Sequence, residues 1–305
     1  MSECILKATE LVKTFGKKNA VDHINLEITR GDICGLLGKN GAGKTTFIRL
    51  IVGLATPKSG KIELFGSTSL CKGLRKCGAV IENPVLVPHM TARQNVELQR
   101  IALGVEDKSI TGELLELVGL SDTGRKKAKN FSLGMKQRLG IALALVGDPE
   151  FLFLDEPING LDPVGIKDIR DLILKLNREL GITVMISSHI ISELTKIVTR
   201  YGVISEGKMV DEFTAEELSE RVRDSLKLRV DEVDKSLIVI KEELGISDAK
   251  KDYSGNVLIY GATGREKEIK EALESREITV YSISAEEGDY EKYFIELMEG
   301  GTKRV

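Results

Sequence analysis

The chain has 305 residues, of which 42% are hydrophobic and 30% charged, and its formal net charge is −3. This balance is typical of a folded globular protein with one large and one smaller domain, or with two medium-sized ones. The slight acidity and the lack of tryptophan argue against a nucleic-acid-binding protein, which usually carries a basic surface and aromatic stacking platforms.

Nothing in the sequence predicts a membrane span or a secretion signal. The N-terminal segment has scattered charges and no apolar core. The longest apolar runs, at 141–146 and 151–154, are far shorter than the ~18 residues that suggest a span, so any membrane role is expected to come through a partner. Four cysteines without a CxxC pair predict buried or semi-buried reduced thiols of a cytosolic protein: Cys4, Cys34, Cys71 and Cys77.

The first predicted elements are strands with one helix among them. Strands are expected at Cys4–Thr9, Ile24–Thr29, Ile33–Leu37, Lys61–Phe65 and Gly78–Glu82, and a helix at Thr45–Val52. The third strand is nearly all apolar, which is typical of a strand buried on both faces. Helical spacing then takes over and predicts helices at Thr91–Leu103, Ser109–Val118 and Leu133–Val146. This region is expected to be a helical insertion, over about residues 88–148, within a sheet-based domain.

The chain then returns to strands. The predicted elements are the strand Phe151–Leu154, the one-face apolar helix Val164–Leu180, the strand Thr183–Ser187 and the hairpin Tyr201–Phe213. Beyond about Arg223 we expect the strands Leu226–Val230, Ala249–Tyr253, Val257–Tyr260 and Ile278–Ile283, and the helices Asp234–Leu244, Arg265–Ser275 and Tyr290–Met298. The order βαββαβ predicts a small ferredoxin-like α+β domain at 223–305 after an α/β domain at 1–222.

A glycine-rich segment follows the apolar strand Ile33–Leu37 and opens a helix. It fits the pattern GxxxxGK[ST] in the context that this pattern requires. Glycines let backbone N–H groups surround phosphate oxygens, and the helix N-terminus adds positive potential. Lys44 is expected to reach the β- and γ-phosphates, and the Thr45 hydroxyl to hold Mg²⁺. The residues expected to bind ATP here are Gly38, Asn40, Gly41, Ala42, Gly43, Lys44, Thr45 and Thr46.

Two carboxylates, Asp155 and Glu156, follow the predicted buried strand that begins at Phe151. Because the carboxyl end of a strand lies at the ligand-binding edge of such a sheet, Asp155 suits an Mg²⁺ site and Glu156 a general base acting on the γ-phosphate. The alternative is a solvated strand end. Three weaker signals follow the same logic. Ser132 with Gly134 suits a helix start that binds an anion, Asp162 could equally be a helix cap, and His189 ends a strand, where a histidine is more often structural.

The order of these motifs resembles the ATP-binding cassette (ABC) family over roughly residues 1–220. The resemblance implies a P-loop NTPase of RecA-like α/β fold with a helical insertion, which binds ATP and Mg²⁺ and hydrolyses ATP. It implies that Ser132 and Gly134 belong to the signature motif, Asp162 to the D-loop, and that His189 is the switch histidine at the γ-phosphate. It also implies that Phe15 stacks on adenine, with a place in the core as the alternative.

Two departures from the family pattern narrow the resemblance. The signature is FSLGM where most members have LSGGQ, so Leu133 replaces a glycine and Met135 a glutamine. Glu82 stands where the family has a glutamine that touches Mg²⁺ and the attacking water; a carboxylate is the stronger ligand for a hard cation. Together they are similar to subunits of the bacitracin-resistance and lantibiotic-immunity type, which belong to exporters of peptide antibiotics.

The family arrangement implies a head-to-tail dimer in which Lys44 of one cassette faces Ser132 of the other across ATP. The second copy can be the same chain or a related subunit. The other implied partners are integral membrane permease subunits at the cytoplasmic face of the membrane, with His89, Met90 and Arg93 as possible contacts or as an ordinary solvent-facing loop. Two alternatives are disfavoured: a soluble ABC ATPase on ribosomes or DNA, and a nucleotide-gated module that does not hydrolyse ATP.

Overall fold

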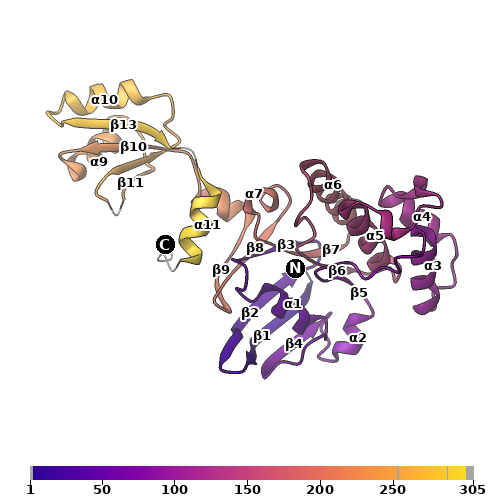
Figure 1. The fold of residues 1–305 in the computed structure, drawn as a ribbon. Coiled ribbons are helices and arrows are strands. Elements are labelled where there is room, and N and C mark those ends of the chain that lie inside the picture. Colours follow the sequence, from indigo (N-terminus) through magenta and orange to yellow (C-terminus); the bar gives the residue numbers. More distant parts are fainter. Residues whose placement is uncertain (1–2, 253, 287, 300–305) are drawn as a thin grey trace. The chain divides into compact units, whose positions relative to one another are not determined.

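The computed structural model describes residues 3–252, 254–286 and 288–299. The chain divides into two compact units (Figure 1). The first unit runs from the N-terminus to Ala215 and resumes at Phe294, and the second is Glu216–Tyr293. This division falls a few residues before the boundary expected from the sequence at 222/223. It also assigns most of the closing helix to the first unit.

A six-stranded sheet forms the centre of the first unit, in the order β5-β6-β7-β3-β8-β9. Its strands are β3 (Ile33–Leu37), β5 (Cys77–Val80), β6 (Phe151–Asp155), β7 (Thr183–Ser188), β8 (Arg200–Ser205) and β9 (Lys208–Thr214). All neighbours are parallel except β8 and β9, which form an antiparallel hairpin. Every residue of β3, β6 and β7 is buried, as expected for parallel strands covered on both faces. Their carboxyl ends therefore share one edge of the sheet.

A second, antiparallel sheet consists of β1 (Cys4–Phe15), β2 (Lys18–Thr29) and β4 (Ser59–Leu64), in the order β2-β1-β4. The helix α1 (Lys44–Ile51) contributes Phe47, Ile48, Leu50 and Ile51 to one apolar cluster with side chains of both sheets. The core thus fixes the helix that follows the glycine-rich loop. The strands β1 and β2 are longer than expected, so Phe15 ends a strand that was predicted to stop at Thr9.

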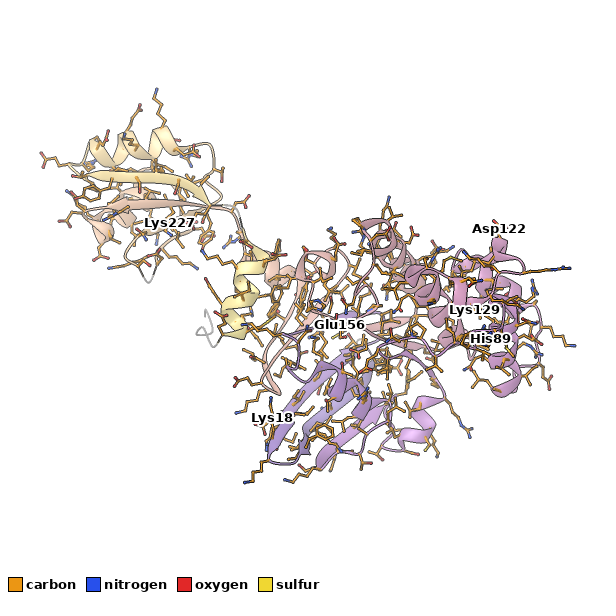
Figure 2. All side chains as sticks on the ribbon, in the orientation of Figure 1. Lys18, His89, Asp122, Lys129, Glu156 and Lys227 are labelled. Atoms are coloured by element: carbon orange, nitrogen blue, oxygen red, sulfur yellow. The ribbon has the colours of Figure 1, made fainter. Side chains whose placement is uncertain are left out.

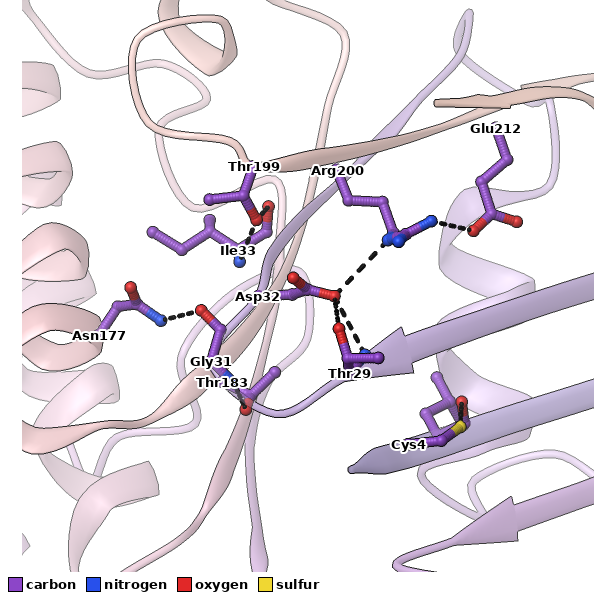
Figure 3. A network of polar contacts seen from close by, with 11 residues as sticks. Cys4, Thr29, Gly31, Asp32, Ile33, Asn177, Thr183, Thr199, Arg200 and Glu212 are labelled. Carbon is purple, nitrogen blue, oxygen red and sulfur yellow. Dashed lines mark hydrogen bonds and ion pairs between the residues drawn. The ribbon is translucent and has the colours of Figure 1, made fainter. Parts of the chain in front are cut away.

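Polar contacts hold the turn between β2 and β3 (Figure 3). Asp32 Oδ2 accepts hydrogen bonds from the Thr29 N–H at 3.0 Å and from the Thr29 hydroxyl at 2.5 Å. Arg200 Nε lies 3.5 Å from the same oxygen, and Arg200 Nη1 donates to Glu212 Oε1 at 3.0 Å. Burial raises the pKa of the Glu212 carboxyl, although Arg200 opposes that rise. The contacts attach β3 to β2, β8 and β9.

The helical insertion expected at about residues 88–148 contains α3 (Ala92–Ala102), α4 (Ile110–Leu117) and α5 (Leu133–Leu145). Two 3₁₀ turns, Ser121–Thr123 and Ala128–Asn130, connect the last two. A capping box starts α3: the Thr91 hydroxyl accepts from the Gln94 N–H, and the Gln94 side chain accepts from the Thr91 N–H. The long helix α6 (Pro163–Leu180) packs against β7 and α5. Short helices that the sequence did not predict are α2 (Leu70–Leu74), α7 (Ile191–Leu194) and α8 (Ala215–Arg221).

The second unit has the predicted order βαββαβ. Its elements are β10 (Ser225–Val230), α9 (Val233–Glu242), β11 (Ala249–Lys251), β12 (Val257–Tyr260), α10 (Glu266–Glu274) and β13 (Val280–Glu286). The antiparallel sheet has the order β11-β12-β10-β13, and one apolar cluster joins its inner face to α9 and α10. This is the ferredoxin-like arrangement that was expected. Tyr253, the last residue of the predicted strand Ala249–Tyr253, lies outside the described residues.

The helix α11 (Tyr290–Met298) brings Phe294 into the first unit. The ring of Phe294 lies 5.6 Å from that of Tyr201 and 5.9 Å from that of Phe213, between centroids. Among the described residues, no helix combines the length and hydropathy of a bilayer span. All four cysteines are free. The expectation of burial is wrong for Cys4 and Cys71, which are exposed.

Candidate functional site

The glycine-rich loop joins β3 to α1 and depends on glycine at defined positions. Gly43 has φ +115°, and a Cβ there would lie 2.3 Å from the Ala20 carbonyl oxygen. A Cβ on Gly38 would lie 2.4 Å from the Ile204 carbonyl oxygen. Both distances are far below contact, so only glycine lets the loop pack this closely on β2 and β8. The loop therefore presents its N–H groups and the start of α1 as one fixed concave backbone.

Lys44, Glu156 and His189 meet at the carboxyl edge of the six-stranded sheet. Lys44 Nζ donates to the Gly38 carbonyl oxygen at 2.7 Å and lies 3.2 Å from Glu156 Oε1. Glu156 Oε2 lies 2.8 Å from His189 Nδ1. Lys44 is 5% and Glu156 18% exposed, so little water screens this attraction. Figure 2 labels Glu156 within the first unit. Glu156 also has φ +52°, which is unusual for a non-glycine residue and common at active sites.

Asp155 is completely buried beside this group, and one of its oxygens has an unused bonding position. The Ser187 hydroxyl donates to Asp155 Oδ1 at 2.5 Å, and the Glu156 N–H donates to Ser187 Oγ at 3.0 Å. Asp155 Oδ2 has no hydrogen-bond partner in the structure. A buried carboxylate oxygen without a partner is costly unless a cation or an ordered water compensates it. Ser187, which the motif analysis did not single out, thus orients both carboxylate residues.

These residues fit Mg²⁺. The ion uses one or two protein oxygen ligands together with phosphate oxygens and water, rather than a dense protein cage. Asp155 Oδ2 and the Thr45 hydroxyl, in the first turn of α1, are oxygen donors of the required kind.

Glu82 follows β5 and is paired with a residue that the sequence did not single out. Arg49 Nη2, in the last turn of α1, donates to Glu82 Oε1 at 2.8 Å. Both side chains are about half exposed, at 44% and 56%. The backbone of Glu82 has φ +56°. The carboxylate expected at the metal is therefore held by a cation on the helix that carries Thr45.

The signature segment forms a separate cavity of about 330 Å³ with the loop before α6. Ser132 is the N-cap of α5, and its hydroxyl accepts from the Met135 N–H at 3.2 Å. Asp162 caps α6 by accepting from the Gly165 N–H at 3.1 Å. Gly134 also lines the cavity, but no residue of the glycine-rich loop does. Within one chain, the signature segment and the D-loop thus line the same cavity, and Lys44 does not line it.

Of the remaining predicted residues, Phe15 is 58% exposed, which removes the alternative that it belongs to the core. Lys13 Nζ lies 5.3 Å from the centre of its ring. Asn40 and Gly41 are exposed, Ala42 is buried and Thr46 is half-buried, as expected for a loop that faces a ligand with one side.

A groove of about 850 Å³ lies beside the segment after Glu82. The segment Asn83–Val85, with α2, α3 and α5, contributes to its walls, and Pro84 packs so closely on Gly140 that a Cβ there would lie 2.6 Å from it. Val85 at 94%, Leu54 at 68% and Leu103 at 53% exposure give the groove apolar walls. His89 and Arg93, which could be partner contacts or part of an ordinary solvent-facing loop, are exposed, and Met90 is half-buried (Figure 2 labels His89).

Comparisons with known proteins agree with this geometry. Residues 21–159 match the family described as ABC transporter. The bacitracin transport ATP-binding protein BcrA of Bacillus licheniformis is 41% identical over 98% of this chain and 98% of its own length. The lantibiotic transport ATP-binding protein SrtF of Streptococcus pyogenes is 42% identical over 68% of this chain and 89% of its own. A dimeric ATP-binding cassette in a post-hydrolysis state with ADP and Pi is 28% identical, covers 69% of this chain and 99% of its own, and superposes with a TM-score of 0.63.

Proposed function

This chain belongs to the ABC transporter family, as an ATP-binding subunit that hydrolyses ATP, and on that premise we propose that it powers export of an antimicrobial peptide through separate membrane subunits. The observation that carries the export proposal is the similarity to BcrA over 98% of both chains, because it includes the second unit as well as the cassette. The similarity to SrtF, named for lantibiotic transport, supports the same substrate class.

The site residues take the following roles in this proposal. The loop N–H groups and Lys44 bind the β- and γ-phosphates, and Lys44 exchanges its contacts with Gly38 and Glu156 for phosphate oxygens. Phe15 stacks on adenine. Thr45, Asp155 and Glu82 hold Mg²⁺, which when bound neutralises charge on the phosphates.

Hydrolysis is assigned to the carboxylate at the end of β6. Glu156 orients the attacking water and accepts its proton. His189, 2.8 Å from Glu156, holds that carboxylate and contacts the γ-phosphate. The buried environment of Glu156 strengthens these contacts relative to bulk water.

A second cassette completes the site. Ser132 and Gly134 lie in a cavity that no residue of the glycine-rich loop lines, so their phosphate contact is made to the nucleotide of the second copy, in a two-fold arrangement. A related cassette forms a dimer, which supports this arrangement. The second copy is the same chain or a related subunit.

The membrane subunits are assigned to the groove beside Asn83–Val85. The groove has exposed apolar walls, lies beside the segment that follows Glu82 and reaches the helical insertion. A membrane-subunit segment bound there would therefore move when the two cassettes close. The chain would then work at the cytoplasmic face of the membrane. The names of the relatives, with transport rather than ribosomes or DNA in them, support this partner.

The test expresses the chain with its membrane subunits in a peptide-sensitive host and measures growth in bacitracin-like and lantibiotic peptides. Raised resistance that disappears with Lys44→Ala and with Glu156→Gln is the expected result. A purified chain that hydrolyses ATP, together with unchanged sensitivity to every such peptide, would refute the substrate class and leave the ATPase intact.

A further inference from the structure

The ion pair between Arg49 and Glu82 lies on the face of α1 that leads to the metal-binding hydroxyl. Thr45 and Arg49 are four residues apart, so they share one face of the helix, about 6 Å apart along its axis. Arg49 Nη2 is 2.8 Å from Glu82 Oε1. One oxygen of the Glu82 carboxylate is therefore bound by a cation on the same helix that carries Thr45.

We propose that Arg49 is a positioning residue, which holds the Glu82 carboxylate in an ion pair and releases it to the cation site when Mg²⁺ and ATP bind together. The proposal rests on the proposed function, in which Glu82 contributes to the Mg²⁺ site. Nothing in the family pattern quoted above requires a cation at position 49. It follows from the contact in this structure and from the carboxylate at position 82.

Arg49 compensates the negative charge that Glu82 adds near the nucleotide. A glutamate beside the triphosphate adds a negative charge to a strongly negative ligand, which opposes ATP binding unless a cation compensates it. Arg49 supplies that charge for as long as Mg²⁺ does not. The two cations thus compete for one carboxylate, and the competition makes engagement of Glu82 depend on Mg²⁺.

The backbone supports an exchange between two positions. Glu82 has φ +56°, a conformation that side-chain-bearing residues rarely adopt and that is common at sites which switch. Both side chains are about half exposed, so the ion pair is partly screened and can break. The adjacent Asn83–Val85 segment lines the groove assigned to the membrane subunits. A movement of Glu82 would therefore change the position of a groove wall.

The experiment uses the full chain with Glu156→Gln, so that nucleotide is bound and not consumed. Binding of a fluorescent ATP analogue is followed while Mg²⁺ is titrated, which reports the half-saturating Mg²⁺ concentration independently of turnover. Arg49→Met removes the competing cation and should lower that concentration about two- to fivefold. Arg49→Lys should restore it towards the parent value.

The Arg49→Met substitution in a Glu82→Gln background tests whether Arg49 acts on Mg²⁺ binding through Glu82. There Arg49→Met should change nothing, because the carboxylate that it held is gone. Arg178→Met is the matched control, since Arg178 is an exposed cation in the last turn of α6 and is expected to leave the titration unchanged.

Three outcomes overturn the proposal. No shift with Arg49→Met would make the ion pair incidental, and an equal shift in the Glu82→Gln background would reduce Arg49 to a distant charge. A parent chain that binds no nucleotide, or binds it without regard to Mg²⁺, would overturn the proposed function as well.

Discussion

Glu156→Gln removes one negative charge from between Lys44 and His189 and keeps the size of the side chain. Glu156 Oε1 lies 3.2 Å from Lys44 Nζ, and Oε2 lies 2.8 Å from His189 Nδ1. The amide oxygen of glutamine can still accept a hydrogen bond from His189, in the place of Oε2. It cannot accept the proton of the attacking water. The substitution thus separates catalysis from binding.

The substitution is expected to lower turnover and to raise the affinity for ATP. Loss of a general base lowers turnover about 10²- to 10⁴-fold, which raises the barrier by about 3 to 5.5 kcal/mol. Binding of ATP should instead become tighter. The ammonium group of Lys44, only 5% exposed, is no longer drawn to a carboxylate and is freed for phosphate. Because the Gly38 carbonyl oxygen still accepts a hydrogen bond from Lys44, we expect only a modest net gain of about 1 kcal/mol, or about fivefold in Kd.

The assay pairs phosphate release with binding of a fluorescent ATP analogue on the purified chain. Size-exclusion chromatography with ATP and Mg²⁺ should also show a trapped dimer for the variant. Glu193→Gln is the matched control, because Glu193 is 20% exposed and paired with Arg170 at 2.9 Å, yet lies outside the proposed site. Turnover near the parent rate in Glu156→Gln would remove Glu156 as the base, and weaker ATP binding would contradict the account of Lys44.

Three further outcomes are expected. Phe15→Ala should weaken ATP binding about tenfold and leave the thermal unfolding midpoint unchanged, since the ring is 58% exposed; equal affinity would exclude adenine stacking. Gly43→Ala should lower that midpoint by more than Gly16→Ala does, because both have positive φ but only Gly43 meets a backbone oxygen at 2.3 Å; equal midpoints would contradict the steric argument. Burial raises the pKa of the Cys77 thiol to about 12, so at pH 8 a thiol reagent should label exposed Cys71 first; prior labelling of Cys77 in single-cysteine variants would contradict its burial.

Several parts of the site could be predicted from the sequence because neighbouring residues determine them. A glycine-rich loop between an apolar strand and a helix has one local geometry, and Gly43 at φ +115° shows why glycine is needed. The cap at Ser132 was likewise predictable, since a hydroxyl just before a helix bonds the N–H three residues later. Asp162 caps α6 in the structure, and its role as a D-loop residue stays a prediction.

Other local patterns were less informative. The strand β1 runs past its predicted end and β2 starts before its predicted beginning, because pairing between them, and not their own apolar spacing, sets their length. Burial of Cys4 and Cys71 was predicted from residue type alone and is wrong, since both are exposed in the structure. Ser187 belongs to no motif identified in the sequence, although it lies only two residues before His189.

The sequence by itself thus determined the nucleotide loop, the two carboxylates at the end of β6, the helical insertion and the βαββαβ order, because each depends on residues close together along the chain. Only the tertiary structure decided that Glu156 joins Lys44 to His189, that Arg49 holds Glu82, and that Phe294 packs on Tyr201 and Phe213. The physical reason is that a charged or aromatic side chain has many acceptable partners. Which one it meets depends on how the sheets place segments that lie far apart in the sequence.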